Sequence, residues 1–273
     1  MQFKNITPIT QLQKYIERIW VFECNEKMPN EDLKLVVPNG RLKLLVPFRN
    51  GVAAKMDGWF HHSKENSMTL IGEIDIPCIA DMGTNDVTGT IGVEFSLQGA
   101  YHFFHLQFSD IKNQIHPLTD IAGKLAKQLE EQIANAASIE RKIFLLQQFL
   151  LQQFSLHKND SIFEYCVEKI NASKGRISVK ELEKKTGYSS RWLNMKFKDK
   201  IGISPKNLAS IVRFSQYYNA FTNGNEMEFL KNNLYDFYYD QTHFLKDFKR
   251  FTGLSHQGFQ DHPNDFGKLF YKE

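Results

Sequence analysis

A short segment near residue 190 carries side chains that are suited to reading the edges of DNA bases. Arg191, Asn194 and Lys198 recur at spacings that place them on one face of a helix, and Ser190 and Met195 lie beside them. Arginine donates paired hydrogen bonds to guanine, amide side chains pair with adenine, and lysine is a common phosphate contact. The segment therefore predicts a surface that contacts duplex DNA.

A second segment of similar chemistry follows about 50 residues later. It predicts a helix whose outer face is polar and whose last turn is basic. Lys249, like Lys198 in the first segment, is interpreted as a phosphate contact, which sets affinity and register but carries no sequence information. The side chains suited to contact DNA in this segment are Gln241, Thr242, His243, Lys246, Lys249 and Arg250, and the family resemblance given below implies that the first four read bases.

The elements around the first segment predict a helix-turn-helix unit. Ser178 and Glu181 form an S-x-x-E capping box that opens a helix, and Gly187 supplies the turn. In the helix that follows, Leu193 and Phe197 are spaced to point inward. A short helix, a glycine turn and a helix with a polar outer face are typical of this DNA-binding unit.

A long helix is predicted to join the two segments. Ser204 and Pro205 form a strong start signal, and the apolar pattern continues to Thr222. At 1.5 Å per residue such a helix is roughly 27 Å long, which suits two DNA-reading units about one duplex turn apart.

The second unit is predicted to begin near Glu226. Met227, Leu230 and Leu234 are expected to face inward, and Asp240 to cap the second recognition helix.

The first ~110 residues predict mainly β-strands. Asn39-Gly40 lies between the apolar runs 33–37 and 41–46, which indicates a hairpin. The alternation over residues 90–97 predicts a half-buried strand, followed by a short helix over 100–107.

The region from about residue 118 to 171 predicts three helices. Ile121, Leu125, Leu129 and Ile133 recur at helical spacing in the first, and the others span roughly 138–155 and 160–170. Residues 172–175, Ala-Ser-Lys-Gly, are the best candidate linker.

With these motifs in place, the C-terminal part resembles the DNA-binding domain of the AraC family over about 95 residues. The resemblance implies a helical domain that inserts two recognition helices into successive major grooves. The N-terminal part resembles the β-rich domain found on one branch of these regulators. The segments that carry the two resemblances are 187–193, 197–198, 202–205, 239–244 and 247–255 for the first, and 38–40 and 92–100 for the second.

Three positions depart from the pattern of the family. Met195 stands where a basic residue is common, and His256 replaces the usual proline after Ser255. Phe237 replaces the turn glycine of the second unit, which predicts a strained or rebuilt turn, because a bulky residue is disfavoured at positive φ. We therefore expect the first unit to supply most of the sequence discrimination and the second mainly backbone contacts.

Charge and cysteine content agree with this interpretation. Residues 173–273 carry 17 Lys and Arg against 11 Asp and Glu, about +6, whereas residues 1–172 carry 17 against 20, about −3. A basic C-terminal part suits a polyanion. Three cysteines without a CxxC pair suit a reducing cytoplasm, and neither a signal-peptide core nor a membrane-spanning run is found, so we expect a cytoplasmic protein.

Other chemistry finds little support in the sequence. His61-His62 and His102-x-x-His105 could hold a metal, but ordinary surface or packed histidines are favoured, and no catalytic motif is found. We therefore expect no enzyme activity, metal or cofactor. A set of N-terminal aromatic residues could line an effector pocket, although packing in the core is favoured for them: Trp20, Phe22, Trp59, Phe60, Phe95, Tyr101, Phe103 and Phe104.

The sequence thus predicts an α+β protein with a β-rich sensory or self-association domain (1–115), a helical connecting region (116–172) and an all-α DNA-binding domain (173–273) with two helix-turn-helix units joined by a linker helix. The predicted function is sequence-specific transcription regulation, as an activator, on double-stranded DNA. Expected partners are RNA polymerase, a small-molecule effector in the N-terminal domain and a second copy of the chain. The alternative is a protein-interaction module whose second unit no longer reads DNA.

Overall fold

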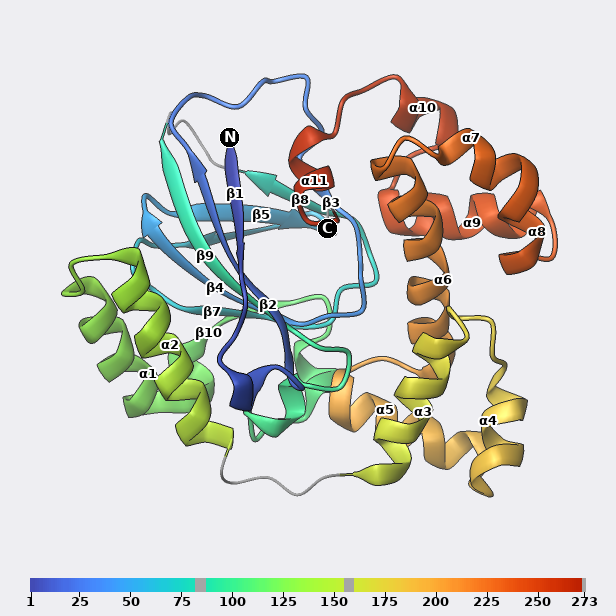
Figure 1. Ribbon diagram of the computed structural model, residues 1–273, viewed down its shortest axis with the longest axis horizontal. Helices are drawn as coiled ribbons and strands as arrows, with labels where there is room; N and C mark the ends of the chain where they lie inside the picture. Colours follow the sequence, from blue (N-terminus) through green and yellow to red (C-terminus); the bar gives the residue numbers. More distant parts are fainter. Residues whose placement is uncertain (82–86, 155–159, 272–273) are drawn as a thin grey trace.

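The structure, a computed structural model, describes residues 1–81, 87–154 and 160–271. It has the α+β architecture that the sequence predicts, with strands in the N-terminal part and helices in the remainder (Figure 1). The last residue of the helix predicted over 138–155 and the last two residues of the predicted domain 173–273 lie outside the described residues. None of the helices in the described part combines the length and apolar composition needed to cross a bilayer.

Within the described residues, the strands form two antiparallel sheets. One sheet has six strands in the order β1-β2-β9-β4-β7-β10, and the other has four in the order β3-β8-β5-β6. The strands are β1 (Gln2–Ile6), β2 (Ile16–Cys24), β3 (Leu35–Val36), β4 (Lys43–Arg49), β5 (Val52–Met56), β6 (Trp59–Ser63), β7 (Thr69–Ile71), β8 (Cys78–Asp81), β9 (Thr88–Phe95) and β10 (Ile115–Pro117).

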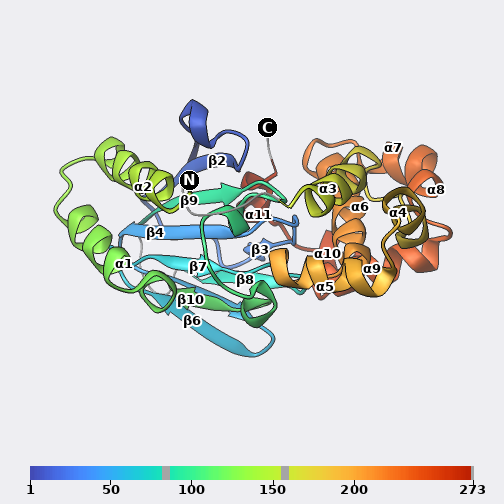
Figure 2. The same cartoon turned by 90° about the horizontal axis from the view of Figure 1, so that it is seen from below.

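The helices follow the strands and fall into two groups (Figures 1 and 2). The first two lie beside the sheets, as α11 does, and α3 to α10 form a helical unit next to them. The α-helices are α1 (Leu118–Ala134), α2 (Ile139–Phe154), α3 (Ser161–Ala172), α4 (Val179–Thr186), α5 (Ser190–Ile201), α6 (Pro205–Thr222), α7 (Glu226–Glu228), α8 (Leu234–Phe237), α9 (Gln241–Thr252), α10 (His256–Gln260) and α11 (Asp265–Leu269). Three 3₁₀ turns, η1 (Thr10–Leu12), η2 (Ala100–His102) and η3 (Phe108–Ile111), and one π-helical turn, η4 (Phe229–Asn233), complete the described elements.

The hairpin predicted at Asn39-Gly40 is wrong. Val36 of β3 pairs with Cys78 in the four-stranded sheet, whereas Leu44 of β4 pairs with Val93 in the six-stranded sheet. Gly40 does adopt a positive φ of 79°, so the turn was correctly located. Its function is different, because it carries the chain from one sheet to the other.

The strand predicted over residues 90–97 is present as β9 but is buried throughout, not half-buried. It lies between β2 and β4. Ile91 and Val93 belong to the main core, and the residues on the opposite face are buried as well. On that face a Cβ atom at Gly92 would lie 2.0 Å from the Trp20 ring, and only glycine leaves room for the indole. The helix predicted over 100–107 is reduced to the short turn η2.

The helical periodicity predicted for α1 holds only in its C-terminal part. Gly123 has φ 53° and ψ −127°, which kinks the helix and shifts its buried face. Leu129 and Ile133 are buried as predicted, but the side chain of Leu125 is 51% exposed.

The helical unit begins before the predicted linker. α3 packs against α6, and the ring of Phe163 lies 5.0 Å from that of Phe197 in α5. Gly175 lies so close to α6 that a Cβ atom there would be 2.2 Å from the carbonyl oxygen of Ala209. The boundary at residues 172 and 173 stays a prediction, and this packing favours one before α3.

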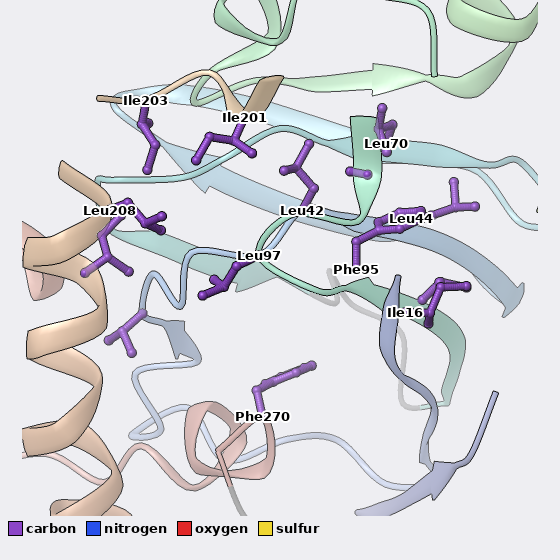
Figure 3. Close-up of a cluster of buried hydrophobic side chains, with 14 of the residues drawn as sticks. Ile16, Leu42, Leu44, Leu70, Phe95, Leu97, Ile201, Ile203, Leu208 and Phe270 are labelled. Carbon is purple, nitrogen blue, oxygen red and sulfur yellow. The ribbon is translucent and has the colours of Figure 1, made fainter. Parts of the chain in front are cut away.

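The helical unit and the sheets share one hydrophobic core. Ile201, Ile203 and Leu208 point toward the cluster that contains Leu42 and Leu97 (Figure 3). All five side chains are at most 7% exposed. The two parts of the chain are therefore joined by apolar burial.

This shared core predicts a single cooperative unfolding transition. Leu208→Ala removes a fully buried side chain at the junction and should lower the free energy of unfolding by about 2–5 kcal/mol. Leu125→Ala, at an exposed position of α1, is the matched control and should change it by less than about 0.5 kcal/mol. Calorimetry measures both, and two separate transitions with only one sensitive to Leu208→Ala would contradict the prediction.

Candidate nucleic-acid interface

The first helix-turn-helix unit has the local structure that its sequence predicts. The Ser178 side chain accepts a hydrogen bond from Glu181 N, and the Glu181 carboxylate accepts one from Ser178 N, which completes the capping box. Gly187 ends α4 in the left-handed conformation with φ 75°. The Ser189 side chain then accepts a hydrogen bond from Trp192 N and starts α5.

The two faces of α5 are also as predicted. Leu193 and Phe197 are fully buried, whereas Arg191 and Lys198 are exposed and Met195 is 57% exposed. The outer face of α5 is therefore accessible to a large ligand.

Two predicted contact residues of this unit are partly engaged within the protein. Asn194 is half-buried, and its Nδ2 donates a hydrogen bond of 2.8 Å to the carbonyl oxygen of Ser190. The backbone N–H of Ser190 in turn donates to the Glu183 carboxylate. Base contact by Asn194 would use its amide oxygen, which these contacts leave unused.

The helix that joins the two units runs over the predicted length. The Ser204 side chain caps it by accepting a hydrogen bond from Asn207 N, and Pro205 occupies the first turn. Its inner face is aromatic toward the second unit, where Phe214 lies 5.1 Å from Phe251 and Tyr217 lies 4.9 Å from Phe244, measured between ring centroids. This packing fixes α9 relative to α6.

The first half of the second unit departs from the prediction. Met227 is 61% exposed and Leu230 only half-buried, whereas Phe229 and Leu234 are buried. Leu230 lies within η4, where i→i+5 hydrogen bonds rotate the backbone relative to an α-helical pattern, and Met227 lies before it in α7, a three-residue helix with no buried side chain.

The strain expected at Phe237 is absent from the structure. Phe237 ends α8 and does not have a positive φ, and Tyr238 leaves the helix in an extended conformation with φ −126° and ψ 141°. The Phe237 ring stacks on Phe229, with the centroids 5.6 Å apart, and the Arg176 guanidinium lies 5.6 Å from its centroid. The turn is rebuilt around an aromatic contact instead of a glycine.

The second recognition helix, α9, begins at the predicted cap. The Asp240 carboxylate accepts a hydrogen bond of 2.7 Å from His243 N. Four of the six predicted contact residues are exposed on its outer face, namely Gln241, Thr242, Lys246 and Lys249.

The other two, His243 and Arg250, have partners inside the protein. His243 is half-buried, with its Nε2 3.3 Å from Arg213 Nη2, and Arg213 also binds the Asp247 carboxylate at 2.9 Å. Arg250 donates a hydrogen bond of 2.7 Å to Asp75 of the N-terminal part. The outer face of α9 therefore consists of fewer residues than its sequence indicates.

Asp75 is the centre of a polar cluster that joins the two parts. It accepts hydrogen bonds from Asn113 at 2.8 Å and from Asn207 of α6 at 3.1 Å, and Lys112 Nζ lies 2.9 Å from its carboxylate. Burial would raise the pKa of Asp75, but the hydrogen bonds from Lys112 and Asn113 and the charges of Lys112 and Arg250 lower it below the usual value. Asp75 is thus held as an anion against α6 and α9.

The structure places the two recognition helices toward the two ends of α6 and on the same side of it (Figures 1 and 2). The exposed residues Arg191, Met195 and Lys198 belong to one end, and Gln241, Thr242, Lys246 and Lys249 to the other. A single duplex could contact both ends of such a surface.

Two tyrosines at this surface were missed by the sequence reasoning. Tyr239 is 90% exposed and immediately precedes the cap of α9, as Tyr188 precedes the cap of α5. Tyr188 stacks on Trp192, with centroids 4.1 Å apart. The shared position before the two caps was the signal that could have revealed them.

The N-terminal part contains the residues that the sequence suggested for a metal site or an effector pocket. Among the described residues, no three His, Cys, Asp or Glu side chains come together as a metal-binding set. Of the aromatic residues proposed for an effector pocket, Trp59 and Phe60 are exposed and the others are buried in the core. Trp20 and Phe22 line a cavity between the sheets.

Residues 4–117 match the family described as a domain of unknown function (DUF6597). No curated protein matches the chain. Experimental structures similar to the chain include ToxT from Vibrio cholerae, with 10% identity, coverage of 99% of each chain and a TM-score of 0.49.

A second structure of ToxT, from Vibrio cholerae strain SCE256 and bound to an unsaturated fatty acid, is 10% identical, with coverage of 95% of this chain and 96% of that one and a TM-score of 0.49. The AraC-like transcriptional activator CuxR is 12% identical, with coverage of 80% and 86% and a TM-score of 0.26.

Substitutions on the two faces of α5 should differ in their effect on the free energy of unfolding. Phe197→Ala leaves a cavity in the core and should lower the free energy of unfolding by about 3–5 kcal/mol. Arg191→Ala, on the exposed face of the same helix, should change it by less than about 0.5 kcal/mol. Denaturant titration of both variants checks the assignment, and equal losses would mean that the faces are reversed.

Proposed function

We propose that the chain is a sequence-specific DNA-binding transcription regulator of the AraC type. The observation that supports this most directly is the placement of α5 and α9 on one side of α6, each with an exposed polar outer face. The 18 residues of α6 correspond to roughly 27 Å, close to the ~34 Å of one duplex turn, so the two helices suit successive major grooves.

Individual roles follow from exposure and chemistry. Arg191 and Asn194 of the first unit and Gln241 and Thr242 of the second are proposed to read bases, with Met195 offering an apolar contact. The proposed phosphate contacts are Lys198, Lys246 and Lys249. His243 and Arg250 are proposed to contact DNA only after they leave the partners they have here, and Ser190 supports the start of α5.

The protein-interaction alternative rested on a degenerate second unit, and two observations weigh against it. The turn at Phe237 is rebuilt without positive φ, and the outer face of α9 keeps four exposed polar side chains. We therefore propose that both units read sequence, in place of the unequal roles that the sequence suggested.

The N-terminal part is proposed to have a sensory role. Its two sheets enclose a cavity with mainly apolar walls that include Trp20 and Phe22, and such cavities are typical sites for small molecules. Activation of transcription, contact with RNA polymerase and self-association stay predictions.

DNA binding is expected to weaken steeply with salt, because phosphate contacts release counterions. The full chain is the appropriate protein, since α6 buries Leu208 against the N-terminal part. Lys198→Ala and Lys249→Ala should each reduce the slope of log affinity against log salt by about one. Lys124→Ala, at an exposed position of α1, is the control and should leave the slope unchanged. The absence of salt-dependent binding to any genomic fragment at low salt would refute the proposal.

Base reading by both units is tested by a base-substitution scan across a selected binding site. Arg191→Ala and Gln241→Ala should each relax the preference at one base pair, by about 1–3 kcal/mol, and at different positions. Lys249→Ala serves as the comparison and should weaken all sequences about equally. A uniform loss for Gln241→Ala would instead assign only backbone contacts to the second unit.

A further inference from the structure

The C-terminal helix α11 leaves the second DNA-binding unit and docks on the N-terminal part (Figure 1). The Asp32 carboxylate accepts hydrogen bonds from the backbone N–H groups of Asp265, at 2.8 Å, and Phe266, at 3.1 Å. Asn264 exchanges two hydrogen bonds of 2.9 Å with the backbone of Leu35 in β3. The docking is therefore specific and not a loose contact.

Two further contacts hold the region of α11 close to residues 35–38. A Cβ atom at Gly267 would lie 2.1 Å from the carbonyl oxygen of Leu35, so only glycine allows this approach. The Tyr271 hydroxyl donates a hydrogen bond of 2.8 Å to the carbonyl oxygen of Pro38.

This docking places two phenyl rings in the wall of the cavity between the sheets. Phe266 lies 5.3 Å from Phe22, and Phe270 lies 5.2 Å from Trp20, both in edge-on contact. The side chains of Phe266 and Phe270 are 3% and 7% exposed. Both line the cavity together with residues of both sheets.

The cavity is small while these rings are in place. Its volume is about 90 Å³. An apolar cavity of about 150 Å³ is known to hold benzene, and ligand pockets usually measure about 300–1,000 Å³. A ligand of ordinary size therefore needs the space that Phe266 and Phe270 occupy.

The polarity of the cavity indicates the kind of molecule that would fit. Lys43 lines it, but its ammonium donates to Asn39 Oδ1 at 3.0 Å and to the carbonyl oxygen of Arg41 at 3.2 Å. Two other lining residues carry buried polar atoms, Trp20 Nε1 and Thr90 Oγ1, that have no hydrogen-bond partner among the described residues. The walls thus favour a small, largely apolar molecule with one hydrogen-bonding group.

We propose that such a molecule binds between the sheets in the place of the Phe266 and Phe270 rings and thereby releases α11. The proposal rests on the sensory role proposed above and identifies its site. Release would reach the DNA-binding unit directly, because Asn264 also donates a hydrogen bond of 2.9 Å to the hydroxyl of Tyr218 in α6.

Phenol is the probe for this site, since it combines one ring with one hydroxyl. Phe266→Ala/Phe270→Ala vacates the space and should bind phenol at least about ten-fold more tightly than the unaltered chain, which must first displace its own rings. Phe259→Ala is the matched control, because Phe259 is equally buried but packs on Phe221 and Phe248 in the helical unit. It should bind phenol no more tightly than the unaltered chain. Calorimetry measures all three affinities.

Amide hydrogen exchange of the unaltered chain gives a second readout that needs no variant to fold. Saturation with phenol should accelerate exchange at Asp265 and Phe266, whose N–H groups bind Asp32, and leave exchange within α1 unchanged. Equal phenol affinity of the double variant and the unaltered chain, or unchanged exchange at saturation, would overturn the proposal. Neither readout involves DNA, so its failure is separate from any failure of the DNA-binding proposal.

Discussion

Burial of α6 on two sides at once is the constraint on which the rest of the structure depends. Near its N-terminus, Leu208 is fully buried at the junction with the sheets, so close to Gly40 that a Cβ atom there would lie 3.0 Å from Leu208 Cδ1. Further along, Phe214 and Tyr217 pack on the aromatic residues of α9. Each fully buried large apolar side chain contributes roughly 1.5–3 kcal/mol, so neither contact is easily lost. One helix therefore sets the separation of the two helix-turn-helix units and ties them to the N-terminal part.

The two helix-turn-helix units are attached to the N-terminal part by different sets of contacts. The first is joined through apolar burial at the end of α5, where Gly202 approaches the backbone of Phe108 in η3. The second is joined through the polar contact of Arg250 with Asp75 and through α11, which adds backbone hydrogen bonds to Asp32 and the burial of Phe266 and Phe270. Apolar burial opposes separation in both units, whereas the contact of the Arg250 guanidinium, which is 36% exposed, can be exchanged for water or phosphate at lower cost. The attachment of the second unit thus includes one contact, that of Arg250, which an anionic ligand could replace.

Much of the helical unit could be predicted because its signals are local. Capping by Ser178, Ser189, Ser204 and Asp240 involves residues three or four positions apart, and all four caps are present. Where prediction failed, a distant partner or an irregular turn was responsible. The π-helical turn at 229–233 interrupts the predicted α-helical pattern, and the pairing of β3 with β8 replaced the hairpin at Gly40. In the Asp75 cluster, Asn207 and Arg250 lie 132 and 175 positions along the chain from Asp75. No local sequence pattern indicates contacts at such separations.

The position of Arg250 shows why a face predicted from sequence is not yet a binding surface. Its place in the last turn of α9 and its charge both suit a phosphate, yet its guanidinium is bound to an Asp75 carboxylate that is 4% exposed. Removal of Arg250 alone would leave that buried anion with Lys112 and the two asparagines, so the cluster does not depend on it entirely. A phosphate could therefore compete for Arg250 without leaving Asp75 unpaired. On the proposed function, Arg250 would serve both the docked arrangement described here and a DNA-bound one, and the balance between them would depend on how firmly α11 keeps the second unit docked.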